Sequence, residues 1–569
     1  MTVAENINSP LVKLSINEDL AKVDTVGKVF LSKLFSYPDK TFLKYKKYGN
    51  FRNISFAETY NSIKSLYVQL NNLGLIYGDR VLFLSENRQQ LITATLGCAM
   101  SGFTSVIACP GYTDKQIQEI IDSCSPKCII ISDEKQFKKL NNIQNTVMIS
   151  FDNLFNKTLY YKDIVKNCRN NDIDFEKIIY SVKPDNTAYI LYQFDAQGKL
   201  EGAKISHNNI LSSVKQTYER LDVLNSDDTA IFNTPLSFIG GLFEIHLILY
   251  SGGICAVADD NKVNTMLENI TEVNASIFSS TPDVWKKLFD NFTRHKKNLE
   301  YFSNNVVVKA TFRKGICWGV IYDESILEFF KYLNVEIIQL YGFIETSGPY
   351  VLFNSDNNEF EPFDNIEISI EEDSEICLKG ESIFSGYLDD KHPLNNGWFR
   401  TGDKGTVTQN GNIKITGGKN NYITLLSGYR VSPLNIETLV YSQFISQIAV
   451  IGDKKEFLSA LVVPDIEYLK EYARKELKLE CRTVNELIKN KWIKSLYRII
   501  FENLNSELAS FEKINRFALL SEPFSVESRE LSDDGKLVRN VIIIRRNREI
   551  ESIYKSHFTK LLFETSYNM

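Results

Sequence analysis

The sequence predicts an α/β protein built on a largely parallel sheet that helices cover on both faces. Short apolar runs typical of buried strands (81–84, 105–108 and 128–132) alternate with segments whose apolar residues recur at helical spacing (55–74 and 90–101). Strands that are joined through helices pair in parallel, because a parallel crossover needs a long connection. The length of 569 residues also predicts several packing units with large cores.

Composition and charge argue against several classes of function. Hydrophobic residues make up 43% of the chain and charged residues 24%, as in globular proteins, and the net charge of -6 lacks the basic excess of nucleic-acid-binding proteins. No apolar run is long enough to span a bilayer, and the N-terminal segment lacks the apolar core of a signal peptide. The nine cysteines form no CxxC pairs, so we expect reduced thiols rather than a zinc site or disulfides. We therefore expect a cytoplasmic protein with at most peripheral membrane contact.

One stretch, residues 189–210, places a strand, a glycine-bearing segment and a helix start in succession. The apolar strand 189–192 is followed by a turn-like segment that holds Gly198 and Gly202, and an amphipathic helix then runs to about Leu221. This order forms a common cradle for phosphate, because free backbone N–H groups point at the anion. We expect Gly198 and Gly202 to shape such a loop.

The same stretch resembles the phosphate-binding loop of the adenylate-forming (AMP-binding) superfamily, which includes acyl-CoA synthetases, luciferases and peptide-synthetase adenylation domains. Gly198 and Gly202 fall on loop glycines, and residues 206–209 fall on the Ser/Thr-His-x-Asn tail. The chemistry of the loop is degenerate, since residues 193–197 replace hydroxyl and glycine positions and Glu201 replaces a lysine. Two like charges ~4 Å apart at an effective dielectric of ~20 repel by about 4 kcal/mol, so Glu201 would oppose a polyphosphate.

A second resemblance follows the strand and turn of residues 230–238. The apolar helix that Gly240 and Gly241 open is similar to the family's acyl-pocket segment P-L-x-H-x-x-G, with Phe238 at the histidine position. The resemblance implies that Phe238, Gly240 and Gly241 bind substrate. An alternative is that the two glycines only allow close packing of the helix.

The strand 335–340 leads into Tyr341-Gly342-Phe343-Ile344-Glu345-Thr346, which is similar to the family motif YG-x-TE. The resemblance implies that Tyr341 and Gly342 border the adenine and the acyl group, and that Glu345 is catalytic as the ligand of Mg²⁺ on the triphosphate. A hard cation that bridges phosphates needs such an oxygen anion. Upstream, Trp318 occupies a turn where the family has small residues, and we expect it to crowd the adenine slot.

Residues 397–403 reproduce the family's GWF-x-TGD. The resemblance implies that Asp403 accepts hydrogen bonds from both ribose hydroxyls, a role that suits a short carboxylate after a glycine turn. In the hinge segment that follows, Gly418 replaces an arginine that contacts ribose and phosphate. The adjacent Lys419 is a cofactor-binding candidate, although neighbouring positions of an extended segment point opposite ways. We place the domain boundary here, with an N-terminal AMP-binding domain at 1–418 and a C-terminal lid domain at 419–569.

The C-terminal part carries further family signatures. Gly428 opens a G-x-x-V-x-P-x-x-IE pattern and is a substrate-binding candidate, and Lys536 lies in the closing motif E-LT-x-x-GK-x-x-R. The resemblance implies that Lys536 is the catalytic lysine, whose ammonium group stabilises negative charge during adenylation. In the segment between Gly428 and Lys536, Thr483 and Glu486 predict the start of one long helix. Its apolar, core-facing stripe includes Trp492 and Ile499. This helical insert is similar to long-chain acyl-CoA synthetases.

The whole resemblance implies an α/β fold with a large N-terminal domain of two α/β sheet units plus a small β-barrel, and a small mobile α+β C-terminal domain. It also implies two half-reactions. A carboxylate attacks the α-phosphate of ATP to give acyl-AMP and pyrophosphate, and a thiol such as CoA then displaces AMP.

Two hypotheses of different class remain open. The first is an acid–thiol ligase of the fatty acyl-CoA synthetase type that uses a carboxylic acid, ATP, Mg²⁺ and CoA. The second is a pseudoenzyme that keeps the fold as an acyl-binding or scaffolding protein for a protein partner, because the loop from Gln193 to Glu201 has lost its hydroxyls and lysine. Lys199 or Lys204 within reach of the phosphates would favour the ligase, and Glu201 facing the loop would favour the pseudoenzyme. The resemblance disfavours an amino-acid-activating domain. Relatives of that kind place an aspartate in this stretch to hold the amino group, and residues 232–238 contain no aspartate.

Overall fold

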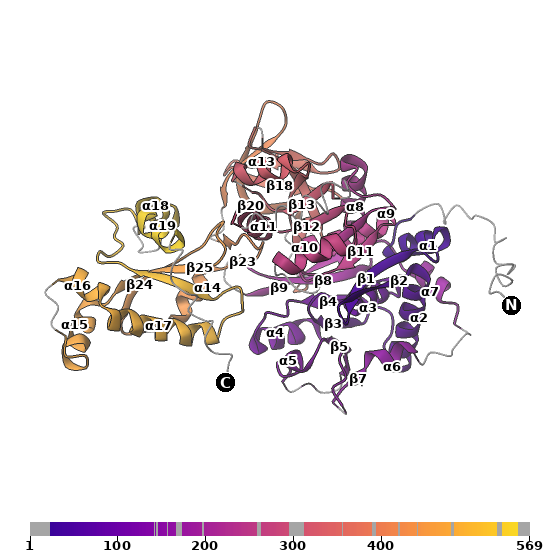
Figure 1. Ribbon diagram of the computed structural model, residues 1–569, viewed down its shortest axis with the longest axis horizontal. Helices are drawn as coiled ribbons and strands as arrows, with labels where there is room; N and C mark the ends of the chain where they lie inside the picture. Colours follow the sequence, from indigo (N-terminus) through magenta and orange to yellow (C-terminus); the bar gives the residue numbers. More distant parts are fainter. Residues whose placement is uncertain are drawn as a thin grey trace.

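The computed structural model describes residues 23–555, with gaps at 142, 144–145, 156, 167–172, 196–198, 259–262, 295–311, 322, 356, 390–393, 419–421, 441, 480–482 and 532–536. Three residues singled out above, Gly198, Lys419 and Lys536, therefore lie outside the described residues. Figure 1 shows a large body formed by the N-terminal elements and a smaller body formed by the elements that follow β23. The predicted α/β class, with a large N-terminal sheet domain and a smaller C-terminal domain, is confirmed.

The first sheet of the large domain is parallel except at one edge. From edge to edge it contains β7 (Leu159–Tyr160), β6 (Val147–Ser150), β5 (Cys128–Ile131), β3 (Arg80–Leu84), β4 (Thr104–Ala108), β8 (Thr187–Phe194) and β9 (Leu200–Ser206). Only the last pair, β8 with β9, is antiparallel. Its strands read as unbroken apolar runs because both faces are buried.

The second sheet joins a parallel and an antiparallel half. The parallel half contains β1 (Thr41–Lys47), β11 (Ile254–Val257), β10 (Thr229–Phe232), β12 (Ile277–Ser280), β13 (Lys314–Trp318) and β14 (Glu336–Phe343), with β2 (Asn50–Ser55) antiparallel at its edge. The antiparallel half contains β15 (Gly348–Asn354), β16 (Glu359–Pro362), β21 (Ile413–Gly418), β20 (Trp398–Val407), β18 (Glu375–Lys379) and β17 (Glu367–Ile370), with β19 (Leu394–Asn395) beside β20. The strands expected in a separate small barrel thus continue the parallel sheet.

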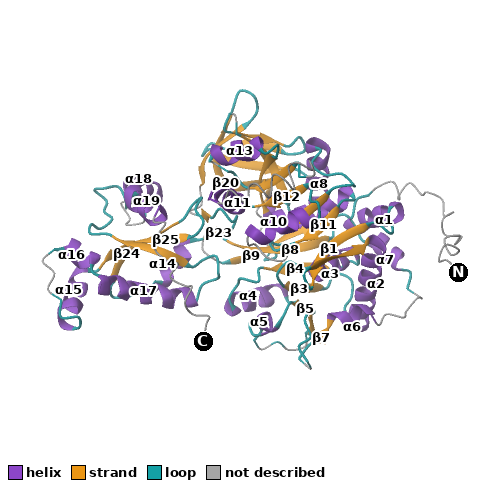
Figure 2. Ribbon diagram, in the orientation of Figure 1, coloured by secondary structure: helices purple, strands orange, loops and turns teal. Residues whose placement is uncertain are grey.

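Helices form layers between and outside the two sheets (Figure 2). The largest hydrophobic core lies between the sheets and contains α1 (Val26–Ser36), α2 (Phe56–Asn72), α3 (Gln89–Met100), α7 (Phe175–Ser181), α8 (His207–Leu221) and α9 (Ile239–Ser251), with α6 (Tyr161–Lys166) beside α2. The outer face of the first sheet carries α4 (Asp114–Cys124) and α5 (Glu134–Phe137). The outer face of the second carries α10 (Val263–Glu272), α11 (Pro282–Arg294) and α13 (Glu324–Tyr332).

The stretch predicted to form the phosphate loop is a β-hairpin. Strand β8 continues to Phe194, and the returning strand β9 begins at Leu200. Gly202, expected in a turn, lies inside β9 opposite Tyr192, because the antiparallel pairing extends over the whole segment. The helix start is as predicted, since the Ser206 and Asn209 side chains form a reciprocal capping box at the N-terminus of α8.

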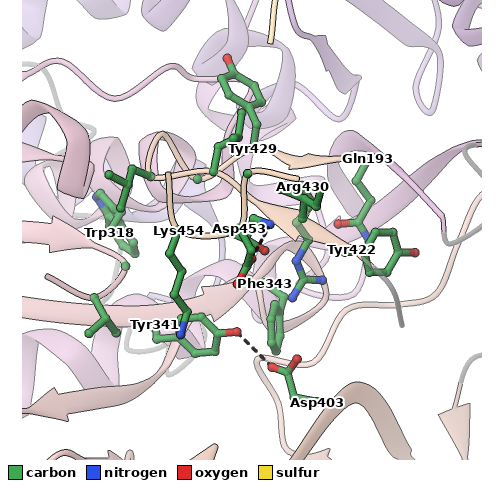
Figure 3. A pocket seen from close by; sticks show the side chains of 18 of the residues that line it. Gln193, Trp318, Tyr341, Phe343, Asp403, Tyr422, Tyr429, Arg430, Asp453 and Lys454 are labelled. Atoms are coloured by element: carbon green, nitrogen blue, oxygen red, sulfur yellow. Dashed lines mark hydrogen bonds between the residues drawn. The ribbon is translucent and has the colours of Figure 1, made fainter. Parts of the chain in front are cut away.

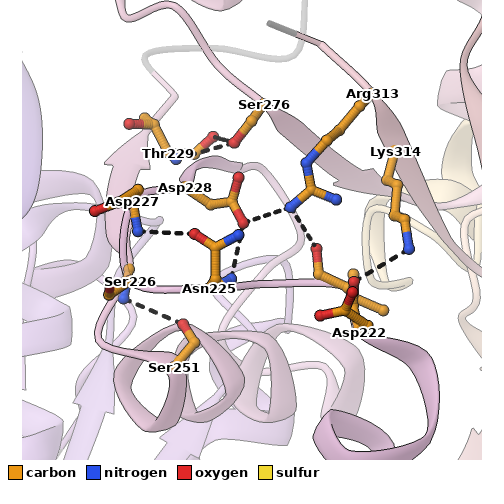
Figure 4. A network of polar contacts seen from close by, with 12 residues as sticks. Asp222, Asn225, Ser226, Asp227, Asp228, Thr229, Ser251, Ser276, Arg313 and Lys314 are labelled. Atoms are coloured by element: carbon orange, nitrogen blue, oxygen red, sulfur yellow. Dashed lines mark hydrogen bonds and ion pairs between the residues drawn. The ribbon is translucent and has the colours of Figure 1, made fainter.

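The far end of α8 is fastened to the strand that carries Trp318 (Figure 4). Lys314 donates from Nζ to the carbonyl oxygens of Leu221 and Asp222 at 3.3 and 3.1 Å, and so satisfies carbonyl groups at the helix C-terminus. The Arg313 guanidinium pairs with Asp228 at 2.6 Å. The hairpin, α8 and β13 therefore hold one another in place.

The C-terminal domain is a three-stranded sheet with helices on both faces. Its strands are β24 (Ile445–Ile451), β25 (Leu458–Pro464) and β26 (Ile514–Leu519). One face carries α14 (Pro433–Leu439), α15 (Ile466–Lys475), α16 (Val484–Lys489) and α17 (Lys491–Ser506), and the other carries α18 (Arg539–Arg545) and α19 (Asn547–Lys555). The hairpin of β22 (Ile423–Thr424) and β23 (Arg430–Val431) lies between the domains, and the boundary after residue 418 stays a prediction.

The long helix predicted after Thr483 is wrong in one respect. Thr483 does cap a helix, but α16 ends at Lys489, and Asn490 adopts an extended conformation and caps the separate helix α17. An asparagine side chain favours such a break because it bonds the backbone of the next turn. The stripe is also only partly core, since Trp492 is 56% exposed and Ile499 is 55% exposed. Among the described residues, no helix combines the length and the apolar character needed to span a bilayer.

Two buried histidines stay neutral in the core between the sheets. His246 Nδ1 donates to the Leu242 carbonyl at 2.7 Å, so its Nε2 must accept the bond from the Tyr189 hydroxyl at 2.8 Å. His207 Nδ1 accepts from the Val26 backbone N–H. Burial lowers the pKa of His207 to about 3 and that of His246 to about 4.

We expect a His246→Gln variant to lose part of the pH dependence of folding. In the folded chain the pKa of His246 is lowered to about 4, whereas the unfolded chain takes up this proton near 6.5. Stability present above pH 6.5 is therefore lost as the pH falls toward 4, by about 1.4 kcal/mol per pH unit for this group. Urea unfolding at pH 7, 6 and 5 measures the slope. Tyr189→Phe is the control, since it removes the bond but keeps the histidine and its slope. Equal slopes in wild type and His246→Gln would contradict the assignment.

Candidate active site

One cavity of about 730 Å³ lies where the C-terminal ends of β13 and β14 meet the hairpin β22–β23 and the turn after β24. Both domains contribute to its wall (Figure 3). Its lining includes the predicted site residues Phe238, Tyr341, Gly342, Asp403 and Gly428. The open ends of parallel strands are where α/β folds place their ligands.

Asp403 and Tyr341 are joined at one side of the cavity. The Tyr341 hydroxyl donates to Asp403 Oδ2 at 3.0 Å. Asp403 lies within β20, and the preceding Gly402 has a φ of +78°, a backbone conformation that suits glycine. Burial raises the pKa of Asp403 above its ordinary value, while the Arg430 guanidinium and the bond from Tyr341 oppose the rise. The sequence placed these two residues beside the same nucleotide, and the structure brings them into contact.

Glu345 lies in the short 3₁₀ turn η5 (Ile344–Thr346) at the end of β14 and is only 3% exposed. The Tyr387 hydroxyl donates to its Oε1 at 2.6 Å, and the Gln193 side-chain amide donates to the same atom. Burial, followed by the charge of Glu345, raises the pKa of Tyr387, so the tyrosine stays a donor. Oε2 is buried and has no hydrogen-bond partner among the described residues. A free, oriented carboxylate oxygen of this kind fits a hard cation such as Mg²⁺.

Gly342 has a structural requirement of its own. A Cβ atom at this position would lie 2.1 Å from the carbonyl oxygen of Gly348 on the neighbouring strand β15. Only glycine allows β14 and β15 to approach so closely at this bulge.

One face of the β8–β9 hairpin, here called its acidic face, carries Gln193 and Glu201, and Gln193 lines the cavity. Gln193 and Glu201 are directly opposed across the hairpin, so both lie on the face from which Gln193 reaches Glu345. Lys204 opposes Ile190, on the face that packs against α4. Lys199 is exposed and lies 3.6 Å from Asp389. Lys204 is therefore on the face away from Glu345, and the Lys199 ammonium group is paired with Asp389.

A functional residue that sequence reasoning missed, Arg430, supplies a cation to the cavity from β23. Its guanidinium lies over the Phe343 ring, 4.2 Å from the centroid. Burial opposes its charge, but Tyr341 and Asp403 raise the pKa of Arg430 above its ordinary value, and Glu345 acts in the same direction. The guanidinium therefore carries its charge near both carboxylates. The signal was an arginine in strand alternation with the buried Val431.

The predicted acyl-pocket residues divide into two groups. Phe238 and Gly428 line the cavity and touch across the domains, since a Cβ on Gly428 would lie 2.8 Å from Phe238 Cζ. Gly240 and Gly241 do not line it. A Cβ on Gly241 would lie 2.2 Å from the Pro235 carbonyl oxygen, and one on Gly240 would lie 2.6 Å from the Trp318 ring. Close packing accounts for both glycines, which is the alternative left open above.

Comparison with known proteins agrees with this geometry. The AMP-binding enzyme family matches residues 32–388, and the AMP-binding enzyme C-terminal domain matches residues 420–557. The chain belongs to the AMP-binding enzyme family. Similar proteins include the long-chain-fatty-acid–CoA ligase ACSBG2 of Xenopus laevis, 23% identical over 96% of this chain and 86% of that protein. The human ACSBG2 is 22% identical over 88% of each chain.

Solved structures with the same fold share still less sequence with this AMP-binding enzyme. The A-PCP didomain of carboxylic acid reductase from Segniliparus rugosus, in complex with AMP, matches with a TM-score of 0.76 and 15% identity over 94% of this chain and 83% of that one. The o-succinylbenzoate CoA synthetase of Bacillus subtilis matches with a TM-score of 0.64 and 17% identity over 90% and 97% of the two chains.

We predict that Asp403→Asn weakens AMP binding by about 10- to 100-fold, because hydrogen bonds to a charged acceptor contribute about 1.5–3 kcal/mol each. Isothermal titration calorimetry with AMP measures the effect. Asp453→Asn is a matched control, since this carboxyl lines the same cavity but accepts from the Thr424 backbone N–H instead of Tyr341. Equal affinities of wild type and Asp403→Asn would exclude Asp403 as the ribose anchor.

Proposed function

We propose that this AMP-binding enzyme is an acid–thiol ligase that converts a carboxylic acid and ATP into acyl-AMP and then transfers the acyl group to CoA. The observation that carries the proposal is the placement of Arg430 in one cavity with Asp403, close enough to Glu345 for that carboxylate also to favour its charge. A cation between two fixed carboxylates suits a nucleotide whose ribose, metal and α-phosphate must be held together. The names of the similar curated proteins, long-chain-fatty-acid–CoA ligases, support the acyl-CoA synthetase type.

In the first half-reaction a substrate carboxylate oxygen forms a bond to the α-phosphorus, and the bond to the bridging oxygen of the β-phosphate breaks. Pyrophosphate leaves with the electron pair. Asp403 holds the ribose and the Arg430 guanidinium stabilises negative charge that develops on the α-phosphate oxygens. Glu345 Oε2 would hold Mg²⁺, with Gln193 and Tyr387 orienting the carboxylate through its other oxygen. When bound, Mg²⁺ neutralises phosphate charge.

In the second half-reaction the CoA sulfur forms a bond to the acyl carbon, and the bond between that carbon and the phosphate oxygen breaks. AMP leaves and the thiol proton passes to solvent. The contact of Phe238 with Gly428 borders this step, because it joins the acyl side of the cavity to the C-terminal hairpin. Lys536, the lysine expected to assist adenylation, lies outside the described residues.

A second candidate function follows from the acidic face of the β8–β9 hairpin. Glu201 shares the face of Gln193, and Lys204 lies on the other face, which is the arrangement we expected of a pseudoenzyme. In this reading the fold binds an acyl group or a protein partner without turnover. Arg430 distinguishes the two functions, since a binding protein does not need a cation at the α-phosphate position.

We predict that Arg430→Ala lowers acid-dependent exchange of pyrophosphate with Mg·ATP by about 10²- to 10³-fold, the usual cost of one lost electrostatic stabiliser. Arg430→Lys should restore part of the rate, because it keeps the charge but not the planar fork. Lys414→Ala is the control, since Lys414 lines the same cavity but pairs with Glu359. If the wild type catalyses no exchange with any acid and shows no thermal shift on adding ATP, the ligase function is overturned and the second function is supported.

We also predict that Glu201→Lys strengthens ATP binding, because it replaces repulsion by attraction on the face that reaches Glu345. AMP, which lacks the outer phosphates, should bind equally well to both proteins. Calorimetric titrations with ATP and AMP measure the difference, and Glu201→Gln separates loss of repulsion from gain of attraction. An unchanged ATP affinity in both variants would mean that the hairpin does not contact the outer phosphates.

A further inference from the structure

The indole of Trp318 closes the cavity at the end of β13. The side chain is 5% exposed and lies against the first turn of α9, where a Cβ on Gly240 would come within 2.6 Å of its ring. Phe243 packs against it edge to face, with the centroids 5.3 Å apart. Its Nε1–H donates to Ser279 Oγ at 3.0 Å. The indole is thus held on several sides, and packing on α9 rather than contact with an adenine accounts for its position.

The region behind the indole is polar and sealed. Glu244 on α9 is 1% exposed, and neither carboxyl oxygen has a hydrogen-bond partner among the described residues. Burial raises the pKa of Glu244 to about 8, a rise that the neighbouring Ser279 and Thr234 hydroxyls limit. Thr234 Oγ1 is also buried without a partner in the described part of the chain. A hydrocarbon chain that entered this region would be buried against unpaired polar atoms, which opposes its entry.

The acyl group of a substrate has to approach Trp318. An acid activated at the α-phosphate must lie near Glu345 and Arg430, and the apolar part of the cavity wall extends from there toward α9. This wall consists of Phe238, Ile239, Trp318, Val320, Leu340 and Ile344. The C-terminal hairpin adjoins this wall where Phe238 meets Gly428, and the thiol would approach from the hairpin.

We propose that Trp318 is the floor of the acyl site and that the chain therefore activates a short or compact carboxylic acid rather than a long-chain fatty acid. This inference rests on the proposed ligase function and names its substrate class. It is an alternative to our expectation, drawn from the style of the C-terminal domain, of a long-chain enzyme. At 22–23% identity the long-chain relatives do not settle the substrate.

The test compares acids from acetate to palmitate on the full-length wild type and on Trp318→Gly. Acid-dependent pyrophosphate exchange reports turnover, and calorimetric titration of each acid in the presence of AMP reports binding without turnover. We expect wild type to bind acetate to hexanoate about 10- to 100-fold more tightly than decanoate or palmitate, the usual cost of misfit in a small apolar pocket. Trp318→Gly should shift the optimum to longer acids, and Trp318→Phe, which keeps most of the packing, should give a smaller shift.

Two further variants separate the floor from general damage. Gly240→Ala should force the indole into the cavity and weaken all acids, and the double variant Gly240→Ala/Trp318→Gly should largely restore binding, because the clashing ring is gone. Trp492→Ala, which removes an exposed tryptophan on α17, should leave the length profile unchanged.

Each result decides the proposal. Tight binding of palmitate by wild type, an unchanged profile in Trp318→Gly, or no binding of any acid would overturn it. A length profile that shifts in the calorimeter without any pyrophosphate exchange would support the floor while refuting the ligase. Pyrophosphate exchange at similar rates with acids of every chain length would support the ligase function while refuting Trp318 as the floor of the acyl site.

Discussion

The cavity depends on one interaction, that of the buried Arg430 guanidinium with the carboxylates of Asp403 and Glu345. Asp403 lies in β20 and Glu345 in the turn η5 that follows β14, both in the large domain, and Glu345 is buried while Asp403 is partly buried. Buried carboxylates without a compensating cation cost several kcal/mol each. Arg430, lying over the Phe343 ring, supplies that charge from outside the large domain. The electrostatics of the nucleotide side are therefore complete only when the hairpin β22–β23 is docked.

Aromatic packing sets the position of that hairpin. Tyr429, the neighbour of Arg430, stacks on Phe511 with centroids 4.2 Å apart and planes 2° from parallel, and Phe511 meets Tyr112 edge to face. A hydrogen bond from Gln116 to Glu512 lies beside this stack. Tyr429 precedes Arg430 in the chain, so this stack holds the backbone from which Arg430 reaches the cavity. Docking of the hairpin β22–β23 therefore also places the charge of Arg430.

The charges of the site are placed differently from those that the family resemblance predicts. The β8–β9 hairpin, which the family resemblance makes the phosphate loop, contributes Gln193 and Glu201 to the face of Glu345, while Lys204 lies on the other face and Lys199 pairs with Asp389. In the hinge segment, Gly418 stands where the family resemblance places an arginine. A cation whose charge both carboxylates favour comes instead from β23. The loss of the family's phosphate-binding residues from the sequence is thus accompanied in the structure by a guanidinium group from a distant segment.

The sequence by itself determined the α/β class, the order of strands and helices, and the motifs that bring Tyr341 and Asp403 to one place. These properties follow from periodicity, caps and glycine turns, all of which act over a few residues. Only the tertiary structure decided that Gly202 lies in a strand, that Glu201 and Lys204 face opposite ways, and that Trp318 lies on Gly240. It alone showed Arg430 beside carboxylates far away in the chain. Such relations depend on strand register and on contacts between distant segments, and local residue patterns carry no record of either.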